Sequence, residues 1–210
     1  MNTNLRRWVG LVGLLFVALV IVSVAITPTA PSGTASAASV VSYYTKHKNG
    51  GSVNAYLIEA AVVVGLWFFW YLRNLLIDAG TDARLTTLGF AGAIIFGMGG
   101  GVGAGMKWAI GDAVNHVSPA TLQGLSVLQD DLNVILMGIG SAAFLFATCI
   151  AVLKSGALAK WLGWLGIVLG VASLLAFLGP LPAGIWVLVT SIVLLTTKSS
   201  RASQSAVATT

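Results

Sequence analysis

Residues 8–27 read WVGLVGLLFVALVIVSVAIT, a stretch without a single charged side chain. An α-helix rises about 1.5 Å per residue, so this stretch matches the hydrocarbon core of a bilayer, which is about 30 Å thick. The rest of the chain has the same character, because 57% of its 210 residues are hydrophobic and only 8% are charged. Soluble domains carry about 25% charged residues. The composition therefore excludes an ordinary soluble domain and indicates an integral membrane protein.

Five further stretches are apolar enough to cross a bilayer as helices. Together the six predict an all-α, polytopic transmembrane helix bundle that forms a single domain over residues 1–210. The expected spans cover about 8–27, 55–77, 86–110, 132–153, 161–178 and 181–197. Residues 28–54 are predicted to be an external loop and residues 199–210 a disordered tail, because both are rich in small and polar residues. Ser118 followed by Pro119 is typical of a helix start and predicts an interfacial helix before the fourth span.

The positions of the basic residues predict that both termini lie in the cytoplasm. Cytoplasmic segments of membrane proteins carry the excess of Lys and Arg. With the N-terminus inside, the cytoplasmic side holds Arg6, Arg7, Arg73, Arg84, Lys154, Lys160, Lys198 and Arg201, and the outer side holds Lys46, Lys48 and Lys107. A cleaved signal peptide is the alternative for the first stretch, because two arginines precede it and small residues 34–38 follow it. Its length and the distance to those small residues favour an uncleaved helix.

The charge distribution and the cysteine content restrict which partners and which sites the chain can have. The net charge is +5, but the basic residues are scattered among apolar segments. This scatter fits the membrane orientation rule better than a nucleic-acid interface, so the expected partner is the lipid bilayer and not a nucleic acid. Cys149 is the single cysteine, which excludes an internal disulfide and a cysteine-based metal site.

Small residues recur at helical spacing in the third and fifth predicted spans. In the third, Ala93 belongs to a row in which every fourth residue is small, and in the fifth the glycines follow a similar pattern. Such rows let two helix backbones approach closely, within one chain, in a homo-oligomer or against another membrane protein. The predicted packing glycines are Gly89, Gly97, Gly101, Gly105, Gly163, Gly166 and Gly170. The dinucleotide-like spacing of Gly99, Gly101 and Ala104 lies inside a span and follows no strand, so it does not predict a nucleotide site.

Polar residues gather near the expected outer leaflet. We interpret them as a candidate ligand, ion or proton site, and the sequence leaves open whether a metal ion belongs to it. Capping and ion pairing are the simpler interpretation, for example a pair between Glu59 and Lys107. The candidate residues are Glu59, Lys107, Asp112, His116, Asp130, Asp131 and Asn133. No nucleophile, base and orienting group occur together, so we expect no catalytic residue, no cofactor and no enzymatic activity.

Three apolar stretches carry a resemblance to a known family. Residues 56–73 read YLIEAAVVVGLWFFWYLR, residues 156–171 read GALAKWLGWLGIVLGV, and residues 184–195 read GIWVLVTSIVLL. Over residues 43–195 the chain resembles an uncharacterised family of six-span integral membrane proteins, a domain-of-unknown-function family of high-GC Gram-positive bacteria. The resemblance implies a multi-pass protein of the bacterial cytoplasmic membrane and lends no activity. Family members often carry Asp-Pro after the aromatic residue of the first outer loop, whereas here Thr45 and Lys46 follow Tyr44.

The sequence therefore favours a non-enzymatic membrane protein. It would act as a structural or accessory subunit, or it would bind lipid or a small apolar ligand. A small transporter or channel-like protein is the alternative, with the outer-leaflet carboxylates of Glu59, Asp130 and Asp131 on its path.

Overall fold

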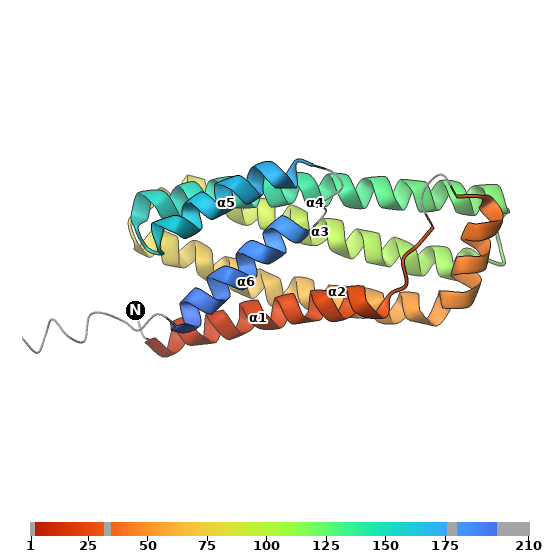
Figure 1. Ribbon diagram of the computed structural model, residues 1–210, viewed down its shortest axis with the longest axis horizontal. Coiled ribbons are helices and arrows are strands. Elements are labelled where there is room, and N and C mark those ends of the chain that lie inside the picture. Colours follow the sequence, from red (N-terminus) through yellow and green to blue (C-terminus); the bar gives the residue numbers. More distant parts are fainter. Residues whose placement is uncertain (1–2, 32–34, 176–179, 197–210) are drawn as a thin grey trace, which may run out of the picture.

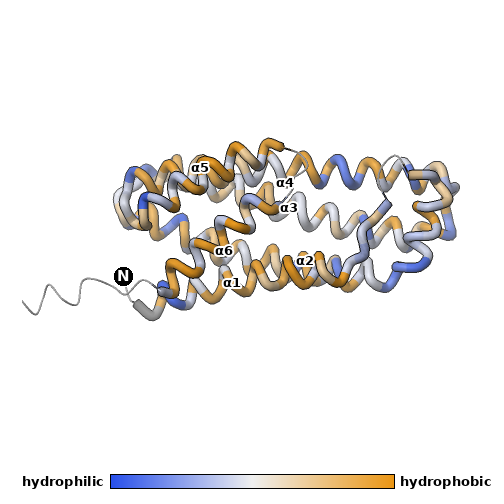
Figure 2. Tube along the Cα trace, viewed as in Figure 1, coloured by the Kyte–Doolittle hydropathy of each residue, from blue (hydrophilic) through white to orange (hydrophobic). Residues whose placement is uncertain are grey.

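The chain folds entirely into helices and short connections over residues 3–31, 35–175 and 180–196, which a computed structural model describes (Figure 1). Its helices are α1 (Thr3–Ile26), α2 (Ala37–Asp78), α3 (Ala83–Ala113), α4 (Pro119–Ser155), α5 (Lys160–Ser173) and α6 (Leu181–Thr196). The predicted all-α class is confirmed. Hydrophobic residues run along the helices, and hydrophilic residues concentrate toward the ends of the bundle (Figure 2).

Four of the helices, α1 to α4, are long and apolar enough to cross a membrane. The remaining two are shorter, since α5 has 14 residues and α6 has 16. At the helical rise these lengths correspond to roughly 21 Å and 24 Å, less than a hydrocarbon core of about 30 Å. The predicted fifth span, 161–178, extends beyond the described end of α5, and the predicted tail, 199–210, lies outside the described residues.

The six helices pack in chain order, and α6 returns to pack against α1. The hairpin of α5 and α6 covers the part of the bundle near the N-terminus and leaves the opposite part to the longer helices (Figure 1). Beneath the hairpin, aromatic rings pack edge to face from α1 to α6. The series runs through Phe16, Phe69, Phe144 and Trp186. The fully buried Trp186 donates a hydrogen bond from Nε1 to the carbonyl oxygen of Leu162 at 3.0 Å, which fixes α6 against α5.

Helices α3 and α4 approach each other closely at several glycines. An added Cβ on Gly92 would meet the backbone nitrogen of Phe144, and one on Gly140 would meet the backbone nitrogen of Phe96. At Gly99 an added Cβ would lie 2.9 Å from the backbone nitrogen of Met137. Glycine is required at these positions because a methyl group would push the two backbones apart.

This face differs from the predicted row of small residues on α3. Gly89 does face α4, where an added Cβ would lie 2.6 Å from Oγ1 of Thr148, but Gly97 faces Val62 of α2. An added Cβ on Gly101 or Gly105 would meet no described atom within 4 Å. A helix has about 3.6 residues per turn, so a row taken at every fourth residue drifts away from one partner. On α5 the glycines do face neighbours, because Gly163, Gly166 and Gly170 pack against Leu153, Cys149 and Phe146 of α4.

The predicted external loop, 28–54, is corrected by the structure, because α2 begins within it. Ser36 accepts a hydrogen bond from the backbone nitrogen of Ser39 and caps the helix. The first turns of α2 cross the end of the bundle before the helix bends at His47, where φ is −114° and ψ is 21° (Figure 1). Val40 and Tyr44 lie one turn apart and bury against Leu122, so burial of an apolar face explains the helix.

Before the fourth predicted span, the expected helix start is found at Ser118. Its side chain accepts a hydrogen bond from the backbone nitrogen of Thr121, and Pro119 occupies the first helical position. The expected interfacial helix is the first part of α4, which continues without a break to Ser155.

Candidate ligand cavity

A cavity of about 810 Å³ lies between α1, α2, α3, α4 and α6. This volume falls within the range of small-molecule sites, roughly 300–1,000 Å³. Much of its wall is apolar, including Phe16 and Val20 of α1, Phe96 of α3, Met137 of α4 and Leu188 of α6. The loop that follows α1 and the first turns of α6 also line the cavity.

Helix α3 shapes the cavity by presenting mostly small residues to it. Phe96, Gly100, Gly103 and Lys107 fall three or four positions apart and so share one face. An added Cβ on Gly100 would find Ile58 Cγ2 at 3.6 Å, which is ordinary contact. The cavity therefore exists partly because α3 has no large side chain between Phe96 and Lys107 on this face.

Polar side chains gather at one end of the cavity, and they come from four helices. They are Ser23 of α1, Asn54 of α2, Lys107 of α3, and Gln129, Asp130 and Asn133 of α4. The Nδ2 group of Asn54 donates hydrogen bonds to the carbonyl oxygen of Ser23 at 3.1 Å and to its Oγ at 2.6 Å. These bonds join the C-terminal part of α1 to the interior of α2.

Opposite charges face this cavity from α3 and α4. Lys107 and Asp130 are the charged residues among its described lining. They are close enough for each charge to influence the other, but they form no ion pair within the described structure. The lining is therefore electrically neutral overall and carries two separated charges.

Two amide oxygens beside these charges lack partners. Gln129 Oε1 and Asn133 Oδ1 are buried and accept no hydrogen bond in the described structure. The Gln129 side chain belongs to a residue that is only 1% exposed. Gly103 makes room for Asn133, because an added Cβ there would lie 2.8 Å from Asn133 Cγ. A buried acceptor without a partner is unfavourable, so the site is poised to receive a hydrogen-bond donor.

Three of the predicted site residues share this cavity and four do not. Lys107, Asp130 and Asn133 line it. The other four, which are Glu59, Asp112, His116 and Asp131, are exposed and lie outside its lining. Glu59 forms no ion pair with Lys107 in the described structure, so the expected pairing is not observed there.

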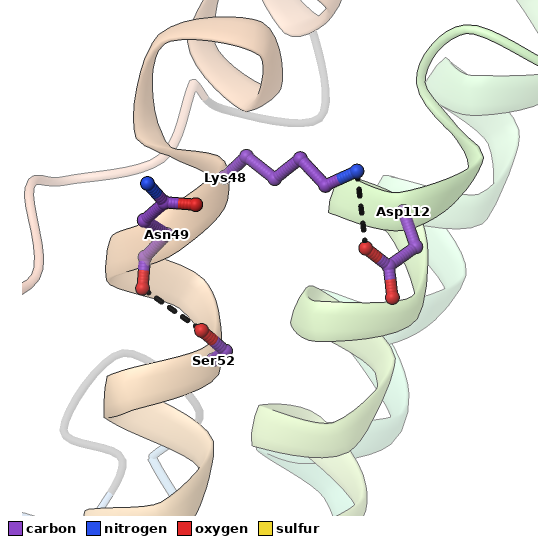
Figure 3. A network of polar contacts seen from close by, with 4 residues as sticks. All are labelled: Lys48, Asn49, Ser52 and Asp112. Carbon is purple, nitrogen blue, oxygen red and sulfur yellow. Dashed lines mark hydrogen bonds and ion pairs between the residues drawn. The ribbon is translucent and has the colours of Figure 1, made fainter.

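Asp112 instead pairs with α2. Its Oδ1 lies 3.3 Å from Nζ of Lys48 and links α3 to the start of the long segment of α2 (Figure 3). In the same view, Ser52 Oγ donates a hydrogen bond to the carbonyl oxygen of Asn49. Among the described residues, no three His, Cys, Asp or Glu side chains are grouped so that they could hold a metal ion.

Sequence reasoning missed Ser23, Asn54 and Gln129. Ser23 is a lone hydroxyl in an apolar helix, and Asn54 stands where a loop was predicted. Gln129 gave a usable signal, because it precedes Asp130 and shares a helix face with Asn133. A continuous polar face that enters an apolar span indicates a site, and here that face begins one residue earlier than predicted.

A comparison of the chain with known proteins finds no match among family models, curated proteins or solved structures. The cavity and its lining are therefore the basis for assigning a function.

Proposed function

We propose that this protein binds an amphipathic, lipid-like molecule in the cavity and performs no chemical reaction on it. The observation that carries the proposal is the gradient of polarity along the cavity. Lys107 and Asp130 lie at one end of the cavity, and the wall at the other end, which includes Phe96, is apolar. At the helical rise, the stretch from Phe96 to Lys107 is roughly 16 Å long, about half of a bilayer's hydrocarbon core.

The direction of this gradient matches that of a lipid in one leaflet. Helix α1 provides the candidate span Leu5–Ile26, so Ser23 lies close to one membrane surface. The hydrogen bonds from Asn54 to Ser23 support assigning the polar end of the cavity to the same level. The apolar wall, including Phe16, then lies toward the centre of the bilayer. A lipid-like molecule would keep its ordinary orientation inside the protein.

For the topology, we propose six spans with both termini in the cytoplasm of a bacterial cell. The distribution of Lys and Arg supports this orientation. The hairpin of α5 and α6 also supports this topology, because α6 packs back against α1. The polar end of the cavity then belongs to the outer leaflet.

A cavity-filling variant and a matched control test the proposed function. Gly100 lines the cavity, whereas its neighbour Gly101 does not and has no described atom within 4 Å of an added Cβ. We expect wild-type protein and Gly101→Phe, extracted gently with native lipids, to retain a lipid-like molecule in native mass spectrometry. Gly100→Phe is expected to lose it.

A second cavity-filling variant shows whether the loss of binding in the first is caused by misfolding. Gly184 of α6 also lines the cavity, and an added Cβ there would meet no described atom within 4 Å. Gly184→Phe is therefore expected to lose the same molecule while keeping the melting temperature of delipidated wild-type protein. Equal retention by wild type and both filled variants would refute the cavity as the binding site, and a wild type without bound molecules would refute the function.

A further inference from the structure

The polar end of the cavity restricts what kind of headgroup can occupy it. Its charged lining residues, Lys107 and Asp130, carry opposite signs and form no direct pair in the described structure. Burying an unpaired charge is costly, so each needs a partner of opposite sign when water leaves. One occupant that carries both an anionic and a cationic group would satisfy both, and its net charge would be zero.

The uncharged side chains restrict the cationic group further. Gln129 Oε1 and Asn133 Oδ1 are buried acceptors without donors, and both side chains line the cavity beside Asp130. The last torsion of an amide side chain has broad preferences, so either oxygen can turn toward an occupant. A primary ammonium offers three N–H donors, whereas a quaternary ammonium offers none. The acceptors on α4 therefore favour a primary ammonium.

We infer that the cavity selects a zwitterionic lipid whose headgroup joins a phosphate to a primary amine. Lys107 receives the phosphate, while Asp130, Gln129 and Asn133 receive the ammonium. This inference rests on the proposed function, because the apolar wall next to Phe96 and Val20 holds the lipid chains. The same headgroup chemistry occurs in soluble phosphoethanolamine compounds, but these leave the apolar wall unfilled.

Three lipids with identical acyl chains separate the headgroup from the chains. We would add phosphatidylethanolamine, phosphatidylcholine or phosphatidylglycerol to delipidated, detergent-solubilised full-length protein and measure occupancy by native mass spectrometry. Phosphatidylethanolamine is expected to bind about tenfold more tightly than phosphatidylcholine, the effect of losing one charge-assisted hydrogen bond. Glycerophosphoethanolamine, which has no acyl chains, is expected not to bind at the same concentration.

Neighbouring aspartates give a matched pair of variants. Asp130 lines the cavity, whereas Asp131 is exposed and does not. Asp130→Asn is expected to reduce the preference for phosphatidylethanolamine over phosphatidylcholine, because the charge-assisted hydrogen bond is lost while the amide acceptors remain, and Asp131→Asn is expected to preserve it in full. Lys107→Met is expected to weaken binding of both lipids. The comparison of the three lipids on wild-type protein needs no variant, so it tests the inference even where a substitution prevents folding.

Each other outcome has a distinct meaning. Equal binding of the three lipids would overturn the headgroup inference and leave the proposed function intact. Preference for phosphatidylglycerol would also overturn it, because the site would then select net negative charge. Binding of glycerophosphoethanolamine without acyl chains would identify a soluble ligand and overturn the lipid source. Absence of any bound lipid would overturn both this inference and the function on which it rests.

Discussion

Replacing Gly92 with alanine tests the close contact between α3 and α4. The added Cβ would meet the backbone nitrogen of Phe144 and would lie 2.9 Å from Cβ of Ala143. Carbon atoms pack best at about 3.5–4.0 Å, so the two helices would have to separate by roughly 1 Å. Gly101→Ala is the control, because it lies on the same helix and an added Cβ meets no described atom within 4 Å.

The two variants gain the same helix propensity, but only one of them overpacks the contact between the helices. Alanine is favoured over glycine inside a helix by about 1 kcal/mol, and both variants gain this. Overpacking a tight contact costs about 1–3 kcal/mol, and only Gly92→Ala incurs this cost. The free energy of unfolding should therefore be lower for Gly92→Ala than for Gly101→Ala by about 1–3 kcal/mol.

Equilibrium unfolding in mixed micelles would measure this difference. The chain has 7 tryptophans, whose fluorescence reports unfolding. Gly140→Ala provides a second test, because its added Cβ would meet Phe96 and Gly92 from the opposite helix. Once one methyl group has separated the helices, a second one costs less, so Gly92→Ala and Gly140→Ala should not be additive. Equal stability of Gly92→Ala and Gly101→Ala would refute the close contact.

Two further predictions concern polar contacts between helices. The hydroxyl groups of Ser141 and Ser173 are buried at 2.8 Å from one another, and a double-mutant cycle with alanine should give a coupling energy of about 0.6 kcal/mol, as for other hydrogen bonds inside membranes; zero coupling would contradict the bond. The ion pair between Lys48 and Asp112 joins side chains that are 48% and 56% exposed. Asp112→Asn should therefore lower the free energy of unfolding by less than about 1 kcal/mol in the same assay, and a larger loss would mean that the pair is shielded from solvent.

Element type was predictable from the sequence, because a bilayer imposes it. Every backbone polar group inside hydrocarbon needs a partner, and a long apolar stretch can satisfy this only as a helix. Ser118 and Pro119 set the start of α4 through local capping, which a sequence displays directly. The start of α2 was missed, because residues 28–54 are polar on average. Burial of Val40 and Tyr44 against other helices stabilises the helix there in addition to the Ser36 cap, and composition does not report that burial.

The glycines of α3 that contact α4, apart from Gly89, were missed for a different reason. The stretch from 97 to 105 contains so many glycines that several helix faces satisfy a pattern of small residues. The choice between Gly99 and Gly101 depends on the direction in which α4 lies, and only the fold provides it. The site was partly predictable, since Lys107 and Asp130 are costly in a membrane and stand out. Ser23 was not, because its role depends on its contact with Asn54, 31 residues away.

The difference in helix length explains why the bundle contains a cavity. Helix α4 has 37 residues, whereas the two helices of the hairpin have 14 and 16. Around Trp186, α6 fills the space between α1 and α4 with an aromatic side chain. Nearer to Asn133, the described part of α6 contributes only its first turns to the lining. The described hairpin thus does not extend along the N-terminal part of α4, which packs against α2 and α3 instead.

The side chains that line this cavity do not fill it. Gly100 and Gly103 add no volume, and Gln129 leaves a buried oxygen without a partner. Larger apolar residues at these positions would fill the cavity and remove an unfavourable polar group, so the present sequence is not optimised for stability of the empty protein. An occupant that fills the volume and donates hydrogen bonds would offset both costs. Small residues, separated charges and unpartnered acceptors would then be features of one binding site rather than independent defects of packing.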